Sequence, residues 1–120
     1  MPRKKPIDRV REICLALPEA TEKEAWGEPT FRVRDKIFAQ FEDDHHGSGI
    51  VGLWCKAPDG AQAFLVAGDP ARFYVPKYVG NKGWIGIRME GAVDWAQVAE
   101  LLRDSYRMIA PKRLAARLVE

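Results

Sequence analysis

Two runs of alternating apolar and polar residues, separated by a short polar turn, constrain this fold more than any other feature of the sequence. In the first run, Phe31 and Val33 share one face, and Arg32 and Arg34 share the other. A period of two on both sides of Arg34-Asp35-Lys36 is typical of an antiparallel hairpin with one buried face. In the second run the alternation places Ile37, Ala39 and Phe41 on one face, and Phe38, Gln40 and Glu42 on the other.

Helical periodicity marks both ends of the chain. Residues 6–17 carry apolar side chains at a spacing of about 3.6 residues, between Pro6, which suits a first helical turn, and Pro18, which ends the helix. Near the other end, Asp94 followed by Gln97 predicts the capped start of a long helix. The apolar face of this second helix comprises Trp95, Val98, Leu101, Leu102, Ser105, Tyr106 and Ile109, and residues 112–119 add a short basic helical tail.

The segments between these helices are predicted to be short strands and turns. We expect strands at residues 19–26, 50–56 and 84–89, and an edge strand or irregular segment at 73–79, because Pro76 cannot join a central strand. Residues 43–49 form a polar loop, and 80–83 a flexible basic turn. Asp59 with Gln62 predicts a capped short helix that ends at Gly68.

This order of elements predicts an α+β fold. Short turns between strands favour antiparallel pairing, so we expect a two-layer domain in which the N- and C-terminal helices cover one face of an antiparallel sheet. The chain of 120 residues is expected to form a single domain, 1–120. The opposite face of the sheet should stay partly open, because its alternating positions are polar or charged.

Composition narrows the possible partners and compartment. The net charge is +2, from 19 basic and 17 acidic residues, so any nucleic-acid footprint must be local. Cys14 and Cys55 lie in apolar segments, which favours two buried reduced thiols over a disulfide. No signal peptide and no membrane span are evident, which predicts a cytoplasmic protein without a membrane partner.

Catalytic and metal-binding patterns are weak in this sequence. It contains no P-loop, HExxH or GxSxG motif. The group Asp43, Asp44, His45 and His46 lacks a nucleophile and a metal-ligand spacing, and Tyr106 is better interpreted as a core residue. We therefore expect no enzymatic activity, no catalytic residues, no cofactor and no metal site.

The open face of the predicted sheet gathers cations and indoles. If the alternation holds, this face carries a mixed basic and aromatic set, with Lys36 and Lys82 at the turn tips beside it. Guanidinium groups and aromatic rings together suit contacts to phosphates and bases, which makes DNA the first candidate partner. The alternatives are an anionic small molecule and a protein partner. The predicted binding residues are Arg32, Arg34, Lys36, Trp54, Lys56, Lys82, Trp84 and Arg88.

A purely structural interpretation competes with this one. Exposed strands often carry Arg and Lys because charge protects a sheet from edge-to-edge aggregation. Trp54 and Trp84 could pack against the protein, since an indole is seldom left bare. The positions of these side chains decide between the two interpretations.

The ordered set of motifs resembles the MmcQ/YjbR family of small bacterial proteins over nearly the whole chain. The residues that carry the resemblance are 15–18, 26–39, Lys56, 83–88, 105–106 and 110–113. The chain departs from the family at Asp35, where a glycine is common. It departs again at Asn81-Lys82-Gly83-Trp84, which is one residue shorter than the usual Asn-Lys-x-x-Trp pattern.

This resemblance implies a CyaY-like (frataxin-like) fold, also described as a double wing, and DNA binding as the family's expected function. That functional label is an analogy, because one fold hosts many functions. Iron binding of the frataxin kind is disfavoured, because it needs an acidic ridge of oxygen ligands. In this chain the acidic residues of the first helix and strand are interleaved with Arg9, Arg11 and Lys23.

Overall fold

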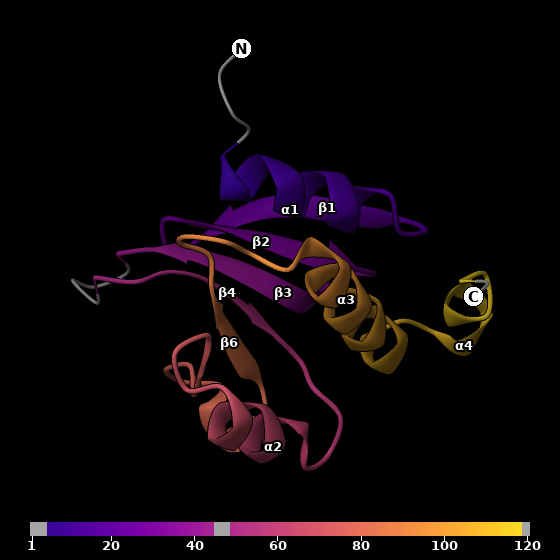
Figure 1. Ribbon diagram of the computed structural model, residues 1–120. Coiled ribbons are helices and arrows are strands. Elements are labelled where there is room, and N and C mark those ends of the chain that lie inside the picture. The colour runs from indigo at the N-terminus through magenta and orange to yellow at the C-terminus, as the bar shows by residue number, and fades with distance from the viewer. Residues whose placement is uncertain (1–4, 45–48, 119–120) are drawn as a thin grey trace.

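The computed structural model describes residues 5–44 and 49–118, and its strands form one six-stranded sheet (Figure 1). The strands lie in the order β1-β2-β3-β4-β6-β5, and every neighbouring pair is antiparallel. The short strand that precedes Pro76 lies at the edge, as its proline predicts. The bounds are β1 Ala20–Ala25, β2 Glu28–Val33, β3 Lys36–Asp43, β4 Val51–Cys55, β5 Phe73–Tyr74 and β6 Ile85–Arg88.

Helices α1 (Pro6–Leu15) and α3 (Trp95–Ile109) lie together on one face of this sheet (Figure 1). Helix α2 (Ala61–Gly68) contacts the edge strand β5, and the short helix α4 (Lys112–Ala115) follows α3. A 3₁₀ turn, η2 (Gly80–Lys82), precedes β6. The predicted α+β architecture, with terminal helices covering one face, is confirmed.

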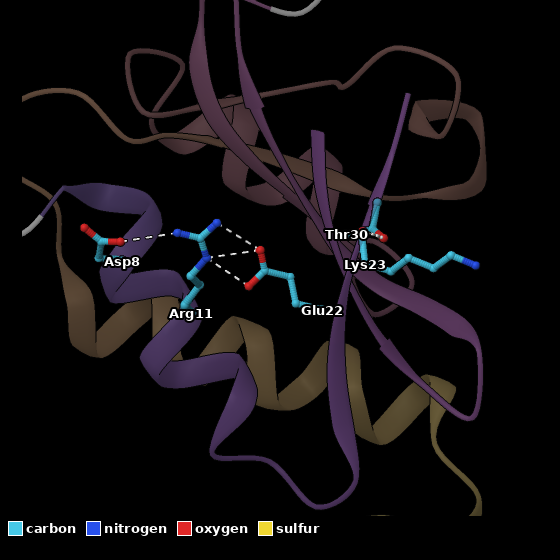
Figure 2. A network of polar contacts seen from close by, with 5 residues as sticks. All are labelled: Asp8, Arg11, Glu22, Lys23 and Thr30. Atoms are coloured by element: carbon cyan, nitrogen blue, oxygen red, sulfur yellow. Dashed lines mark hydrogen bonds and ion pairs between the residues drawn. The ribbon is translucent and has the colours of Figure 1, made fainter. Parts of the chain in front are cut away.

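Helix α1 is attached to β1 by burial and by an ion pair. Its inner face buries Val10 and Cys14. On its flank, the Arg11 guanidinium donates through Nε and Nη2 to both carboxylate oxygens of Glu22, at 2.9 to 3.1 Å. Figure 2 shows Glu22 directed towards α1 and its neighbour Lys23 directed away, so these two residues identify the helix-covered face and the open face.

The predicted hairpin is confirmed, with a two-residue turn. Val33 pairs with Lys36, and both intervening residues have a left-handed backbone, with φ of 51° at Arg34 and 65° at Asp35. Two successive left-handed residues match the right-handed twist of the flanking strands. Asp tolerates this backbone, whereas Arg34 adopts it against its intrinsic preference.

A β-bulge corrects the predicted facing of β3. The register shifts so that Phe31 faces Ala39 while Arg32 faces Ile37, which leaves Phe38 as the extra residue. Phe38 therefore points to the helix layer, where its ring meets Tyr106 edge-on at 5.6 Å. The sequence predicts Phe38 and Ala39 on different faces of the sheet, and this prediction is wrong because both lie on the helix side. The prediction that Ile37 lies on the helix side is wrong as well, since Ile37 pairs with Arg32.

The core lies between the sheet and the two long helices. The inner faces of β4 and β6 are confirmed, because the partners Leu53 and Ile87, and Cys55 and Ile85, are all buried. Helix α3 closes the core with an apolar stripe that agrees with its predicted face. Further fully buried side chains are Val10, Phe31, Val33, Phe38, Leu102, Tyr106 and Leu114.

The predicted cap of α3 is confirmed, since the Asp94 carboxylate accepts a hydrogen bond from the Gln97 backbone N–H at 3.1 Å. The predicted cap of α2 is wrong, because the N-cap is Gly60, which has a left-handed backbone and no side chain to offer. Gln62 is used differently, and its amide donates to the carbonyl oxygens of Gly80 and Trp84 at 2.7 and 2.6 Å. These bonds attach α2 to η2, so residues 80–82 form a helical turn where a flexible one was predicted.

The polar groups of the core are satisfied by the backbone. Tyr106 donates from its hydroxyl to the carbonyl of Pro18 at 2.6 Å, and Ser105 donates to the carbonyls of Lys56 and Leu101. Tyr106 is therefore a core tyrosine, as the sequence indicates. The two thiols, Cys14 and Cys55, are free and buried, which confirms that prediction.

Candidate nucleic-acid interface

The strand register defines which residues share the open face of the sheet. One row of paired residues crosses all six strands in the order Lys23, Thr30, Gln40, Trp54, Gly86 and Tyr74. Paired residues point to the same face, and Lys23 points away from α1, so the whole row lies opposite the helices (Figure 2). Parallel rows add Arg32 beside Ile37, and Arg88 beside Gly52 and Glu42.

The two indoles predicted for this face are not exposed. Trp54 lies in the open-face row but only 2% of it is accessible, and Trp84 is 8% accessible. Neither ring can stack on a nucleic-acid base without a rearrangement. The expectation of an exposed aromatic surface at Trp54 and Trp84 is therefore wrong, and the structural interpretation of these two residues is correct.

Tyr74 covers the open face at Trp54. Its side chain comes from the edge strand β5 and lies across β6 and β4, where Gly86 and Gly52 leave room for it. A Cβ at Gly86 would lie 2.5 Å from Cε2 of the ring, and a Cβ at Gly52 would collide with the phenol oxygen. The two glycines are thus required by close approach of a side chain, which is one of the few reasons for glycine inside a strand.

The phenol of Tyr74 ends at a buried carboxylate. It donates to Oε2 of Glu42 at 2.5 Å, and the Trp54 indole N–H donates to the same oxygen at 2.7 Å. The indole N–H also lies 3.1 Å from the phenol oxygen, which closes a triangle of polar atoms. Burial, followed by the hydrogen bond to Glu42, raises the pKa of the Tyr74 phenol well above its usual range. Glu42 is 2% accessible, so this acid is bonded inside the face and does not lie at its margin.

Two half-buried arginines lie on the open face. The Arg88 guanidinium lies 5.1 Å from the centre of the Tyr74 ring, which is a cation–π contact. Arg32 donates from Nε to the hydroxyl of Thr30 at 3.0 Å. Lys23, at the outer end of the row, is exposed. Within residues 5–44 and 49–118, none of these three cations forms an ion pair with a carboxylate.

Other predicted binding residues lie elsewhere. Arg34 leaves the strand at the turn and pairs with the Glu19 carboxylate at 2.8 Å, so it does not share a face with Arg32. Hydrogen bonding to Arg34 lowers the pKa of Glu19. Lys36 pairs with Val33 and is exposed at the hairpin tip on the helix side, while Lys82 is exposed on η2.

Lys56 follows β4 two residues after Trp54 and is half-buried. It lies beyond the last paired residue of β4, so its place on the open face stays a prediction. Of the predicted residues, the strand register brings together Arg32, Trp54 and Arg88, and Arg34, Lys36 and Lys82 lie apart from them.

Acidic groups on the open face are engaged within the protein. Besides Glu42, strand alternation places Glu28 there, and its carboxylate accepts from the backbone N–H of Asp43 at 2.7 Å. Each acid is held by donors, which directs its lone pairs away from a ligand. Among the described residues, no group of three or more His, Cys, Asp or Glu side chains could hold a metal ion. His45 and His46 lie outside the described residues.

Sequence reasoning missed Lys23 and Tyr74. The sequence predicts a strand around Lys23 but does not assign its side chain to a face of the sheet, because the pairing of β1 with β2 cannot be deduced from β1 alone. Tyr74 left a signal, since Gly52 and Gly86 occupy outward positions of two strands, and paired gaps of this kind indicate a bulky side chain lying over them.

The part of the chain that the structure describes contains no helix with the length and apolar character needed to cross a bilayer.

Comparison with known proteins identifies the family. No curated protein matches the sequence. Among solved structures, the fold is similar to protein DR2400 of Deinococcus radiodurans, which contains the domain DUF419. The TM-score is 0.74 at 21% identity, over 89% of this chain and 82% of the other, and a likeness at that identity shows the fold alone. Residues 15–108 match the family described as YjbR, which covers most of the sequence. The chain belongs to the YjbR family.

Proposed function

We propose that this protein is a non-enzymatic DNA-binding protein that contacts duplex phosphates through the open face of its sheet. The observation that supports this function best is the electrostatic arrangement of that face. Lys23, Arg32 and Arg88 present cations without a carboxylate partner among the described residues, while Glu42 and Glu28 are both bonded within the protein. A face of this kind attracts a polyanion although the net charge of the whole chain is only +2.

The buried indoles determine which kind of contact the face can make. Because Trp54 and Trp84 are nearly inaccessible, base stacking does not contribute. Arginine and lysine at the surface of a sheet reach phosphate oxygens, and such contacts position a protein on a duplex without reading its sequence. The proposed binding is therefore sequence-independent, and it falls steeply as salt concentration rises.

The test is fluorescence anisotropy of a labelled random-sequence duplex at about 50 mM salt, where phosphate contacts are strong. The variant Lys23→Gln/Arg32→Gln/Arg88→Gln removes three cations from the open face. The matched control, Arg103→Gln/Arg113→Gln/Arg117→Gln, removes three exposed cations from α3 and its C-terminal extension. We expect the open-face variant to bind about tenfold more weakly or worse, and the control to retain most of its affinity.

Circular dichroism of both variants should show that they are folded, which would exclude loss of structure as the cause. Equal weakening of the two variants would attribute the binding to net charge and contradict the proposed face. No binding of the unsubstituted chain at this salt concentration would remove the function altogether. Binding of inorganic polyphosphate without binding of duplex would support an anionic small-molecule ligand in place of DNA.

A further inference from the structure

A cavity of about 740 Å³ lies on the helix side of the sheet, away from the open face. It is partly open to solvent and lies between the start of α1, the end of β3, the start of β4, and the segment between β6 and α3, which runs close to α1 in Figure 1. Its apolar floor includes Phe41 and Met89, which are almost fully buried, and one wall is the half-buried indole of Trp95. We call this cavity the α1 pocket. A volume between about 300 and 1,000 Å³ is that of small-molecule sites.

The walls of the α1 pocket are fixed by bonds from side chains to the backbone. Arg72 donates to the carbonyl oxygens of Arg88, Glu90 and Ala92 at 2.6, 3.0 and 2.7 Å, which holds the segment after β6 in place. On the opposite side, the Glu28 carboxylate holds the backbone N–H of Asp43 at 2.7 Å. A pocket whose walls are held in this way is already formed before a ligand binds, so less conformational entropy is lost on binding.

Opposite charges line two sides of the pocket. Lys5 and Arg9 come from the start of α1, and Asp43 and Glu90 come from the strand ends. Arg9 lies with its guanidinium 4.9 Å from the centre of the Trp95 ring, so its position is set by that indole. Within residues 5–44 and 49–118, no ion pair joins either cation to either of these carboxylates.

We infer that the α1 pocket binds a small zwitterion with an apolar body, of the size and chemistry of a short apolar peptide with free termini. Its carboxylate lies against Arg9 and Lys5, and its ammonium group lies against Asp43 and Glu90. Its side chains lie against the partly accessible Ile7, Val51 and Val93. A simple anion is disfavoured because two carboxylates line the site, and a neutral apolar ligand would leave all four charges unused. Charge complementarity at both ends therefore selects the class of ligand.

The test is a titration of the isotope-labelled full chain with the dipeptide Leu-Phe. The chemical shifts of the backbone amide and indole signals are measured by nuclear magnetic resonance at each step. Two blocked probes, N-acetyl-Leu-Phe and Leu-Phe amide, each lack one terminal charge. We expect Leu-Phe to shift the Trp95 indole signal and the amides of residues 89–93. We expect each blocked probe to bind at least tenfold more weakly, because each loses one charged contact.

Variants separate the contributions of the two ends. Arg9→Gln should weaken Leu-Phe about tenfold while leaving its amidated form unaffected, because that probe has no carboxylate to lose. Arg103→Gln, an exposed arginine outside the pocket, is the matched control and should bind Leu-Phe normally. Equal binding of all three probes, or no shift with any of them at millimolar concentration, would overturn the inference. Because Arg9 is not on the open face, duplex binding by Arg9→Gln should be unchanged, so this inference and the proposed DNA binding fail independently.

Discussion

At the scale of single residues, the open face depends on two positions that lack a side chain. Gly52 and Gly86 let Tyr74 lie flat across β4 and β6 and reach the carboxylate of Glu42. The same arrangement covers Trp54, so one aromatic side chain both satisfies a buried acid and shields an indole. The residues that looked most functional in the sequence, the two tryptophans, are structural, and the cations around them remain available.

The substitution Gly86→Ala tests this arrangement. Its new Cβ would lie 2.5 Å from the Tyr74 ring, so the ring must move and the hydrogen bond to Glu42 must weaken. We expect a loss of about 1–3 kcal/mol in the free energy of unfolding, measured by urea denaturation, as for other overpacked sites. Gly68→Ala is the control, because nothing lies within 4 Å of its added Cβ. A double-mutant cycle with Tyr74→Ala should show that Gly86→Ala costs much less once the ring is gone. Additive effects would contradict the proposed packing.

The two buried thiols make stability sensitive to alkaline pH. Burial raises the pKa of Cys55 from 9.0 to about 12, and burial also raises that of Cys14. Above pH 9 the unfolded chain loses these protons while the folded chain keeps them, so stability is fully present below pH 9 and falls as pH rises towards 12. Each thiol contributes a slope of at most about 1.4 kcal/mol per pH unit. Urea denaturation at a series of pH values should show a smaller decline for Cys14→Ala/Cys55→Ala. An identical decline in both chains would contradict this account.

At the scale of elements, the period of hydrophobicity predicted the hairpin, the strands β4 and β6, and both long helices, and β1 was expected as a strand without such a period. The period failed at the bulge, because one extra residue in β3 changes the facing of Phe38 without altering the sequence pattern around it. The capping signal failed at α2, where Asp59 with Gln62 resembles a capping box but Gly60 is the N-cap residue. Tertiary contacts decide both cases. The Phe38 ring packs against Tyr106, and the Gln62 amide donates to the carbonyls of Gly80 and Trp84.

The hairpin turn offers a test of local backbone strain. Asp35 has a φ of 65°, a conformation that glycine adopts at little cost and most other residues avoid. We expect Asp35→Gly to raise the free energy of unfolding by about 0.5–1 kcal/mol. The equivalent substitution at Lys36, which lies in β3 next to the turn, should instead destabilise the chain, since glycine weakens a strand. Thermal and urea denaturation measure both. A destabilised Asp35→Gly variant would show that the aspartate side chain itself stabilises the turn.

At the scale of the whole molecule, the sequence predicted the architecture and the sidedness of the sheet better than the composition of its open face. Alternation correctly assigned Arg32, Trp54 and Arg88 to the side opposite the helices. Alternation cannot show how deeply a side chain is buried, and it cannot show that Arg34 turns towards Glu19, because both depend on segments distant in the sequence. The α1 pocket likewise forms only when α1 meets the ends of three strands.

The salt dependence of duplex binding tests the central claim most directly. The logarithm of the affinity, plotted against the logarithm of the salt concentration, has a slope of about −0.9 for each phosphate contact on B-DNA. We predict that single substitutions Lys23→Gln, Arg32→Gln and Arg88→Gln each reduce the magnitude of this slope by about one. The control Arg103→Gln should leave it unchanged. If the slopes of all four variants equal that of the unsubstituted chain, the open-face cations do not contact phosphates and the proposed interface is contradicted.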